Sequence, residues 1–203
     1  MLKVYLVRHA QSTLNKQGIK QGSDIDSELS EEGLEQVKKL VDKFKKIEID
    51  GIYCSNLKRS FETAKIIGDA LNLKIKQDDN LRELKIGDWS KDKIDPLKRW
   101  IEFYESEKAK GIPREDIRPP NGENSWDHIR RIMTFLNSIE NIHGNLIVIA
   151  HSGTNKVIIG EIQGTDPDNF YTIKQENCCV NELEYDGKKW SVVKINDTSH
   201  FQK

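Results

Sequence analysis

Apolar residues along the chain follow two spacings that alternate with each other. Short runs rich in β-branched and aliphatic residues, bounded by polar or small residues, are typical of buried strands. Four such runs are predicted as strands: Lys3–Arg8, Ile49–Cys54, Leu73–Gln77 and Leu146–Ala150.

Between these runs, apolar residues recur every three or four positions, which predicts amphipathic helices. Ser30 precedes the first of these helices, and its hydroxyl is expected to accept a hydrogen bond from a backbone amide of the first turn. Glu31 and Glu32 follow, where negative charge stabilises the positive end of the helix dipole. The apolar stripes run from Leu34 to Phe44, from Leu57 to Leu71, from Trp126 to Ile139 and from Val157 to Ile162.

Near the C-terminus, the dipeptide Asp186-Gly187 separates two further apolar runs, Val180–Tyr185 and Trp190–Ile195, and predicts a β-hairpin. The alternation of strands and helices elsewhere predicts a largely parallel sheet with helices on both faces. We therefore expect the α/β class: a three-layer α/β/α sandwich whose mostly parallel central sheet has one antiparallel edge strand.

Residues 84–122 interrupt this alternation. They contain the aromatic residues Trp100, Phe103 and Tyr104 and the loop Gly111–Gly122, which together predict a small helical lid inserted between elements of the sheet. A length of 203 residues fits a single domain over 1–203 that includes this lid.

Composition narrows the function classes. The chain is 36% hydrophobic and 32% charged with a formal net charge of −1, so no overall field draws it to nucleic acid or to a membrane. No run approaches the roughly 20 apolar residues of a membrane span, and no secretory leader is recognisable, so a cytoplasmic location is expected. The three cysteines, two of them adjacent, fit neither a disulfide framework nor a zinc spacing.

Two histidines stand immediately after predicted strands, His9 beside Arg8 and His151 after Ala150. Ligands of open α/β sheets collect at the carboxyl ends of the strands, so these side chains suggest a reactive site for an anion. An unperturbed imidazole titrates near about 6.5 and is largely neutral at physiological pH, where it can act as a nucleophile. Spacing alone does not decide which histidine reacts.

A series of motifs runs in order along nearly the whole chain. It comprises Leu6–Asn15 with its Arg-His pair, Gln21-Gly22 followed by Leu29-Ser30 and Gly33, Ser55–Ser60 with Thr63-Ala64, Leu81-Arg82-Glu83 with Gly87 and Trp89, Pro120–Glu123, His151 and Asn196–His200. This series resembles the histidine phosphatase (phosphoglycerate mutase-like) superfamily, and the stretch around Glu83 is similar to its phosphatase branch.

The resemblance implies roles for five residues. His9 would be the nucleophile that forms a phosphohistidine, and His151 would donate to the phosphoryl group. Arg8 and Arg59 would bind the phosphoryl oxygens, for which a guanidinium has a suitable geometry. Glu83 would protonate the leaving alcohol as the general acid. Chemistry alone does not choose between this carboxyl group and the nearby Asp78, Asp79 and Asp88.

Further contacts to phosphate or substrate are expected from Ser12, Asn15, Gln21, Gly22 and Ser152. Arg114 and Arg118 in the predicted lid could bind a substrate carboxylate or a second phosphate, and their role is left open. We expect no metal and no cofactor, because the sequence holds no carboxylate and histidine cluster with metal-ligand spacing.

The leading interpretation is a metal-independent phosphomonoesterase that hydrolyses a small phosphorylated metabolite through a phosphohistidine on His9. One alternative is phosphoglycerate mutase-type transfer, in which the phosphoryl group returns to bound product. A second alternative is a non-catalytic, phosphate-binding regulatory module. No nucleic-acid or membrane partner is expected, and the sequence leaves open the metabolite and whether the protein is a monomer or a homodimer.

Overall fold

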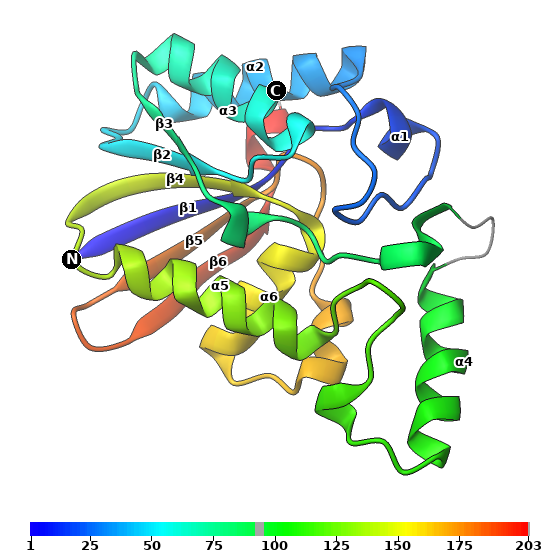
Figure 1. Ribbon diagram of the computed structural model, residues 1–203. Coiled ribbons are helices and arrows are strands. Elements are labelled where there is room, and N and C mark those ends of the chain that lie inside the picture. Colours follow the sequence, from blue (N-terminus) through cyan, green and yellow to red (C-terminus); the bar gives the residue numbers. More distant parts are fainter. Residues whose placement is uncertain (92–95, 203) are drawn as a thin grey trace.

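A central sheet organises the molecule, and helices cover both of its faces (Figure 1). The computed structural model describes residues 1–91 and 96–202, and within them six strands pair in the order β3-β2-β4-β1-β5-β6. Their bounds are β1 Leu2–Arg8, β2 Gly51–Cys54, β3 Ile75–Gln77, β4 Gly144–Ala150, β5 Val180–Tyr185 and β6 Trp190–Asp197.

Strand direction agrees with the expected mostly parallel sheet. The pairs β3–β2, β2–β4 and β4–β1 are parallel, whereas β5 is antiparallel to both β1 and β6. The predicted hairpin is confirmed, and its turn is closed by a hydrogen bond from the Asp186 amide to the Lys189 carbonyl. The strand that runs against all the others, β5, lies one place in from the edge, because it pairs with β1 and leaves the edge to β6.

The helices form the outer two layers of the sandwich. In Figure 1, α2 and α3 lie on one face of the sheet, and α5 and α6 lie on the other. Each face has its own buried core: Val37 and Phe44 pack beneath the first pair, and Ile132 and Ile158 pack beneath the second. The helix bounds are α1 Thr13–Lys16, α2 Glu31–Phe44, α3 Lys58–Leu71, α4 Pro96–Ala109, α5 Ser125–Ile139 and α6 Ser152–Gln163.

Local signals in the sequence fix where these helices begin. The Ser30 hydroxyl accepts a hydrogen bond from the Gly33 amide at 3.0 Å, which confirms the predicted cap of α2. The helix α6 begins directly after His151, whose backbone is extended, so β4 and α6 are joined by this residue. A functional side chain at position 151 is therefore held by secondary structure on both sides.

The segment 84–122 is helical in part, as its sequence predicts, and α4 stands away from the sandwich (Figure 1). Two 3₁₀ turns flank α4, Gly87–Lys91 before it and Arg114–Asp116 after it. Residues 92–95 lie outside the described part of the chain. Trp89 links α4 to the body through its edge-on contact with Phe103 at a ring-centroid distance of 5.1 Å.

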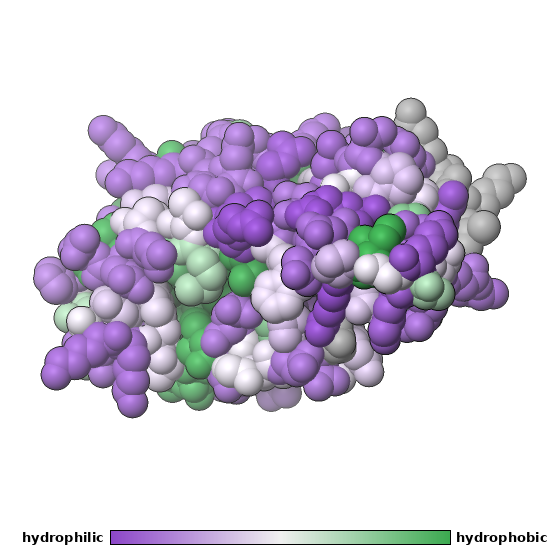
Figure 2. Space-filling view, turned by 60° about the horizontal axis from the view of Figure 1, so that its bottom comes forward, coloured by the Kyte–Doolittle hydropathy of each residue, from purple (hydrophilic) through white to green (hydrophobic). Residues whose placement is uncertain are grey.

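The surface on the α5 and α6 side is mostly hydrophilic, and hydrophobic residues appear there as small areas between charged ones (Figure 2). Across residues 1–91 and 96–202, no helix combines the length and the apolar character that a membrane crossing requires.

Candidate active site

The register of two central strands brings the two candidate histidines together. Strands β1 and β4 are neighbours, and Arg8 stands opposite Ala150, so the next residues, His9 and His151, emerge side by side at the carboxyl edge of the sheet. The His9 amide donates to the Ala150 carbonyl at 3.0 Å. The two imidazole rings are tilted against each other with their centroids 5.1 Å apart. Residues 142 positions apart in the sequence therefore share one site.

The hydrogen bonds of His9 determine where its proton lies. Nδ1 is 2.7 Å from the Ala10 carbonyl oxygen, which can only accept, so Nδ1 carries the proton and Nε2 keeps its lone pair. Burial, with further contributions from the charges of Arg59 and Arg8, holds the pKa of His9 well below its ordinary value of 6.5. At neutral pH the ring is therefore uncharged, with Nε2 available as a nucleophile.

Arg59 reaches this nitrogen from the first turn of α3. Its Nε donates to His9 Nε2 at 3.3 Å, and its side chain is only 2% exposed. The far side of the guanidinium is fixed by the loop before α2: Nη2 donates to the Gly22 carbonyl at 2.7 Å, and Nη1 donates to Asp26 at 2.8 Å. Asp26 also accepts a hydrogen bond from the Lys58 amide and so ties the loop to the start of α3. Asp26 thus acts as the anchor of Arg59.

Arg8 and His151 supply further donors to the same region. Arg8 Nη1 donates to the Gln175 carbonyl at 2.7 Å. Arg8 Nε and both ring nitrogens of His151 are buried and have no hydrogen-bond partner within the part of the chain that the structure describes. Burial, followed by the nearby charge of Arg59, lowers the pKa of His151 well below 6.5, so its neutral ring retains one N–H donor. Two guanidinium groups and an N–H donor around the neutral His9 ring form a site suited to an anion.

Glu83 approaches the same centre from the segment after β3. Its Oε2 accepts a hydrogen bond from the Gly153 amide in the first turn of α6 at 2.8 Å, and its Oε1 accepts one from the Leu84 amide at 2.9 Å. Its negative charge acts on both Arg8 and Arg59. The other candidate acids bond elsewhere: Asp78 to Asn80, Asp79 to Asn56 and Asp88 to Asn121. Of these four acids, Glu83 is the one whose carboxyl group is bound to the start of α6, beside His151.

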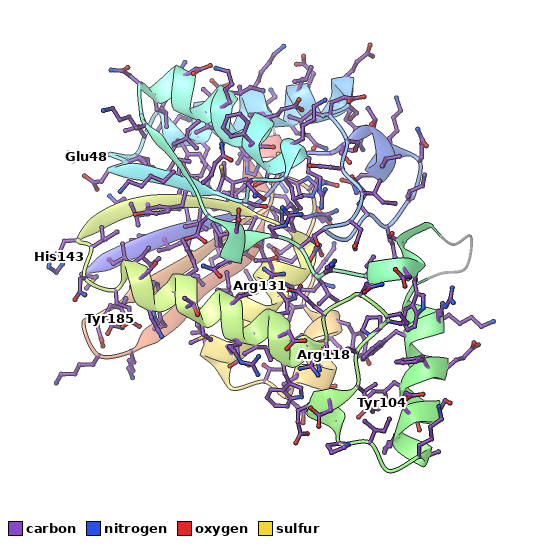
Figure 3. The ribbon with its side chains drawn as sticks, viewed as in Figure 1. Glu48, Tyr104, Arg118, Arg131, His143 and Tyr185 are labelled. Carbon is purple, nitrogen blue, oxygen red and sulfur yellow. The ribbon has the colours of Figure 1, made fainter. Side chains whose placement is uncertain are left out.

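Arg131, which lies outside the sequence motifs, fixes the segment that carries Glu83. From α5 it donates to the carbonyls of Asn80, Arg82 and Glu83 at 2.7–3.0 Å and forms a two-pronged ion pair with Glu123. Figure 3 shows Arg131 near the middle of the molecule, whereas the labelled Glu48 and His143 lie at the left, where β2 and β4 begin. The Glu83 backbone is thus clamped to a helix far along the sequence.

A third buried histidine supports the same segment. Thr154 on α6 donates to the Arg82 carbonyl at 2.9 Å, so its hydroxyl oxygen is left to accept from His128 Nε2 at 3.3 Å. Burial, followed by the charge of Arg131, lowers the pKa of His128 well below 6.5. The pair therefore links α5 and α6 beneath the Glu83 segment.

The residues predicted as further phosphate or substrate contacts bond within the protein in different ways. Ser12, Asn15 and Gln21 bond to one another: the Ser12 hydroxyl accepts from the Gln21 amide at 2.8 Å and from the Asn15 backbone amide at 3.2 Å. Gly22 contributes the carbonyl that holds Arg59. Ser152 is the first residue of α6, beside His151. Contact of any of these residues with a substrate stays a prediction.

The two arginines of the predicted lid are engaged within the protein. Arg118 forms a two-pronged ion pair with Asp127 at 2.7 and 2.9 Å and so ties the segment to α5 (Figure 3). Arg114 lies over the Trp126 ring, 5.9 Å from its centroid, and 4.0 Å from Asp166. Both contacts explain how the segment after α4 is fastened to the body.

Two contributors to the site lie outside the motifs. Asp26 holds Arg59, 33 positions away, and Arg131 holds the Glu83 carbonyl, 48 positions away, so no local spacing marks either residue. A metal site is a separate question: the described residues contain no group of three or more His, Cys, Asp or Glu side chains arranged to hold an ion.

Comparison with known sequences adds independent information. Residues 4–198 match the histidine phosphatase superfamily (branch 1). The chain is 30% identical over 202 residues to the Hydrogenobacter thermophilus protein named "Putative phosphoserine phosphatase 2", with 98% of each chain covered. It is 27% identical to the Erwinia tasmaniensis protein named "Probable phosphoglycerate mutase GpmB", covering all of this chain and 96% of that one.

Comparison with solved structures gives the same fold. Bacillus stearothermophilus YhfR superposes with a TM-score of 0.83 at 25% sequence identity, covering 98% of this chain and 99% of that one.

Proposed function

The chain belongs to the histidine phosphatase superfamily, and we propose that it is a phosphomonoesterase that hydrolyses a small phosphorylated metabolite through a phosphohistidine on His9. One observation carries the proposal. The lone pair of a buried, neutral His9 Nε2 faces Arg59, within a site where Arg8, His151 and the Glu83 carboxyl group converge. A nucleophile, anion-binding donors and an acid are the three parts that such a reaction needs.

The first step transfers the phosphoryl group to the protein. The Nε2 lone pair of His9 forms a bond to phosphorus while the bond from phosphorus to the alcohol oxygen breaks. Protonated Glu83 gives its proton to that oxygen, so a neutral alcohol leaves. Arg8 and Arg59 bind the phosphoryl oxygens, whose charge is spread over the transition state. The proton on Nδ1 stays there throughout, and its hydrogen bond to the Ala10 carbonyl holds the ring in place.

The second step releases the phosphate. The Glu83 carboxylate takes a proton from water as the water oxygen attacks phosphorus, and the N–P bond breaks to return neutral His9 and inorganic phosphate. The same carboxyl group thus acts first as an acid and then as a base, which restores its starting form. Splitting one displacement into two is the general advantage of covalent catalysis.

A mutase would share the first step but return the phosphoryl group to bound product. The relative named as a phosphoglycerate mutase keeps this alternative in view. Independence from metal ions and cofactors, a cytoplasmic location and one domain with a lid over residues 84–122 also stay predictions.

The test uses purified protein with p-nitrophenyl phosphate, phosphoserine and 3-phosphoglycerate, each with and without EDTA. Release of inorganic phosphate that persists in EDTA supports the proposal, and isomerisation of 3-phosphoglycerate without phosphate release would favour the mutase. Rapid quenching after mixing with ³²P-labelled substrate should trap acid-labile label in the wild-type protein and none in His9→Ala. Label retained by His9→Ala would place the nucleophile elsewhere.

A further inference from the structure

Lys156 lies one helical turn beyond the residue that holds Glu83. Gly153, whose amide donates to Glu83 Oε2, and Lys156 are three positions apart on α6, and residues at that spacing share a helix face. Ser152, four positions before Lys156, lies on the same face. Proceeding along this face from His151, one therefore meets the Glu83 carboxylate first and the Lys156 ammonium next.

The ammonium group is held in place and retains donors. Lys156 Nζ donates to the Tyr171 carbonyl at 3.0 Å, from the 3₁₀ segment Pro167–Thr172 that packs on α6. An ammonium carries three N–H donors, so this bond fixes its position and uses only one of them. The side chain is half-buried, and the charges of Glu83, Arg8 and Lys20 all act on its ammonium group.

The proposed reaction gives a direction to the substrate. Because His9 attacks phosphorus and Glu83 protonates the alcohol oxygen, the organic part of the substrate extends from the phosphorus past Glu83. The next charged group of α6 in that direction is Lys156. The lid arginines are less suited to the task, since Arg118 already forms a two-pronged ion pair with Asp127.

We propose that Lys156 binds a carboxylate on the alcohol part of the substrate, so that the enzyme selects phosphomonoesters of carboxylated alcohols. The inference rests on the proposed phosphatase function and adds the substrate class. One ammonium with two remaining N–H donors matches the single charge and two oxygens of a carboxylate. A second phosphate group, with its larger charge, is the other anion that Lys156 could bind, and the experiment must distinguish it from a carboxylate.

Phosphoserine and phosphoethanolamine provide a matched pair, because they differ by the carboxylate alone. The quantity to measure is the ratio of kcat/KM on phosphoserine to kcat/KM on phosphoethanolamine. Both substrates are assayed on the same preparation, so any loss of folded enzyme cancels in the ratio. We expect a wild-type ratio above about 10 and a fall of ~10- to 100-fold in Lys156→Met, the effect of losing one hydrogen bond between charged groups.

Three further proteins sharpen the result. Lys156→Arg keeps the charge and should retain most of the ratio, and Lys156→Gln serves if the Met variant does not fold. Lys38→Met on α2, which removes an exposed lysine that pairs with Glu35, should leave the ratio unchanged. If the wild type prefers 1,3-bisphosphorylated propanediol to phosphoserine and Lys156→Met loses this preference, the group that Lys156 binds is a second phosphate and not a carboxylate.

The outcomes separate the two proposals. A wild-type ratio near one, or a ratio unchanged in an active Lys156→Met or Lys156→Gln, overturns the carboxylate site while leaving the phosphatase function intact. Absence of phosphate release from every substrate, p-nitrophenyl phosphate included, overturns the phosphatase function and the carboxylate site with it.

Discussion

Replacing Glu83 by Gln tests the acid at the centre of the proposed chemistry. The substitution keeps the shape of the side chain and removes the proton that the alcohol oxygen needs. The substitution also disturbs local hydrogen bonds, because the two carboxylate oxygens accept hydrogen bonds from the Gly153 and Leu84 amides. Glutamine has one oxygen, so its NH₂ group must face one of those N–H donors.

The size of the effect depends on the leaving group. General acid catalysis contributes roughly 10²- to 10⁴-fold, which corresponds to about 3–5 kcal/mol of activation free energy. An alkyl alcohol such as serine leaves poorly as an alkoxide, so phosphoserine should show the whole loss. The p-nitrophenolate ion leaves without a proton, so p-nitrophenyl phosphate should lose less than about 10-fold, the portion that comes from disturbed geometry.

The assay must isolate the first chemical step. Single-turnover rapid quenching measures formation of the phosphoenzyme directly, so slow hydrolysis of the phosphohistidine does not hide the difference. Glu62→Gln is a matched control, because Glu62 also accepts a hydrogen bond from a backbone amide, that of Leu29. Its rates on both substrates should stay within about twofold of the wild type, as expected of a residue with no part in the proposed chemistry.

Equal losses on phosphoserine and p-nitrophenyl phosphate would refute the assignment. Glu83 would then position the phosphoryl group or the start of α6, and the proton would have to come from another group. A similar refutation would follow if the alkyl substrate lost less than the aryl substrate.

Four further predictions rest on contacts in the structure. A Cβ added at Gly153 would stand 2.3 Å from Glu83 Oε1, so Gly153→Ala should displace the acid and slow phosphoserine more than p-nitrophenyl phosphate; equal rates with the wild type would contradict the geometry. Arg131→Met removes the clamp on the Glu83 segment and breaks a partly buried ion pair, and it should lower the free energy of unfolding by about 3–5 kcal/mol in a urea titration. His128 has a folded-state pKa below its ordinary value of 6.5, so as the pH drops below 6.5 the unfolded chain binds a proton first and the free energy of unfolding falls. His128→Leu should flatten this dependence of the free energy of unfolding on pH by up to about 1.4 kcal/mol per pH unit between pH 6 and 5. An unchanged slope would show that the ring is charged in the folded protein. Burial raises the pKa of Asp197, but hydrogen bonds led by the one from Lys43 outweigh burial and hold this pKa below 3.8. The charged carboxylate therefore stabilises the fold above pH 3.8, and this stabilisation is lost as the pH falls further. Asp197→Asn should lower the free energy of unfolding by about 3 kcal/mol at pH 7, and the difference in stability between the variant and the wild type should narrow below pH 3.8.

Much of the architecture follows from local patterns. Strand and helix ranges agree with hydrophobic spacing because burial on one face of an element imposes its period on the sequence. The cap at Ser30 and the turn at Asp186-Gly187 are local as well, since each is decided by residues within four positions. The position of β5 inside the sheet was not predictable in this way, because strand order depends on pairing between distant segments.

The candidate site, like the fold, was predictable from the sequence only in part. Sequence by itself determined the candidate groups: an Arg-His pair after one strand, a histidine after another and an acid within a recognisable stretch. It also determined that His9 and His151 follow strands, which in a parallel sheet directs them to one edge.

Only the tertiary structure decided how these groups work together. The β1–β4 register set the two rings 5.1 Å apart, and the Ala10 carbonyl fixed the proton of His9 on Nδ1. Choosing Glu83 over its acidic neighbours required the Gly153 amide, 70 positions away. Burial then lowered the pKa of His9 by excluding water, an effect of the packed molecule that no single segment contains.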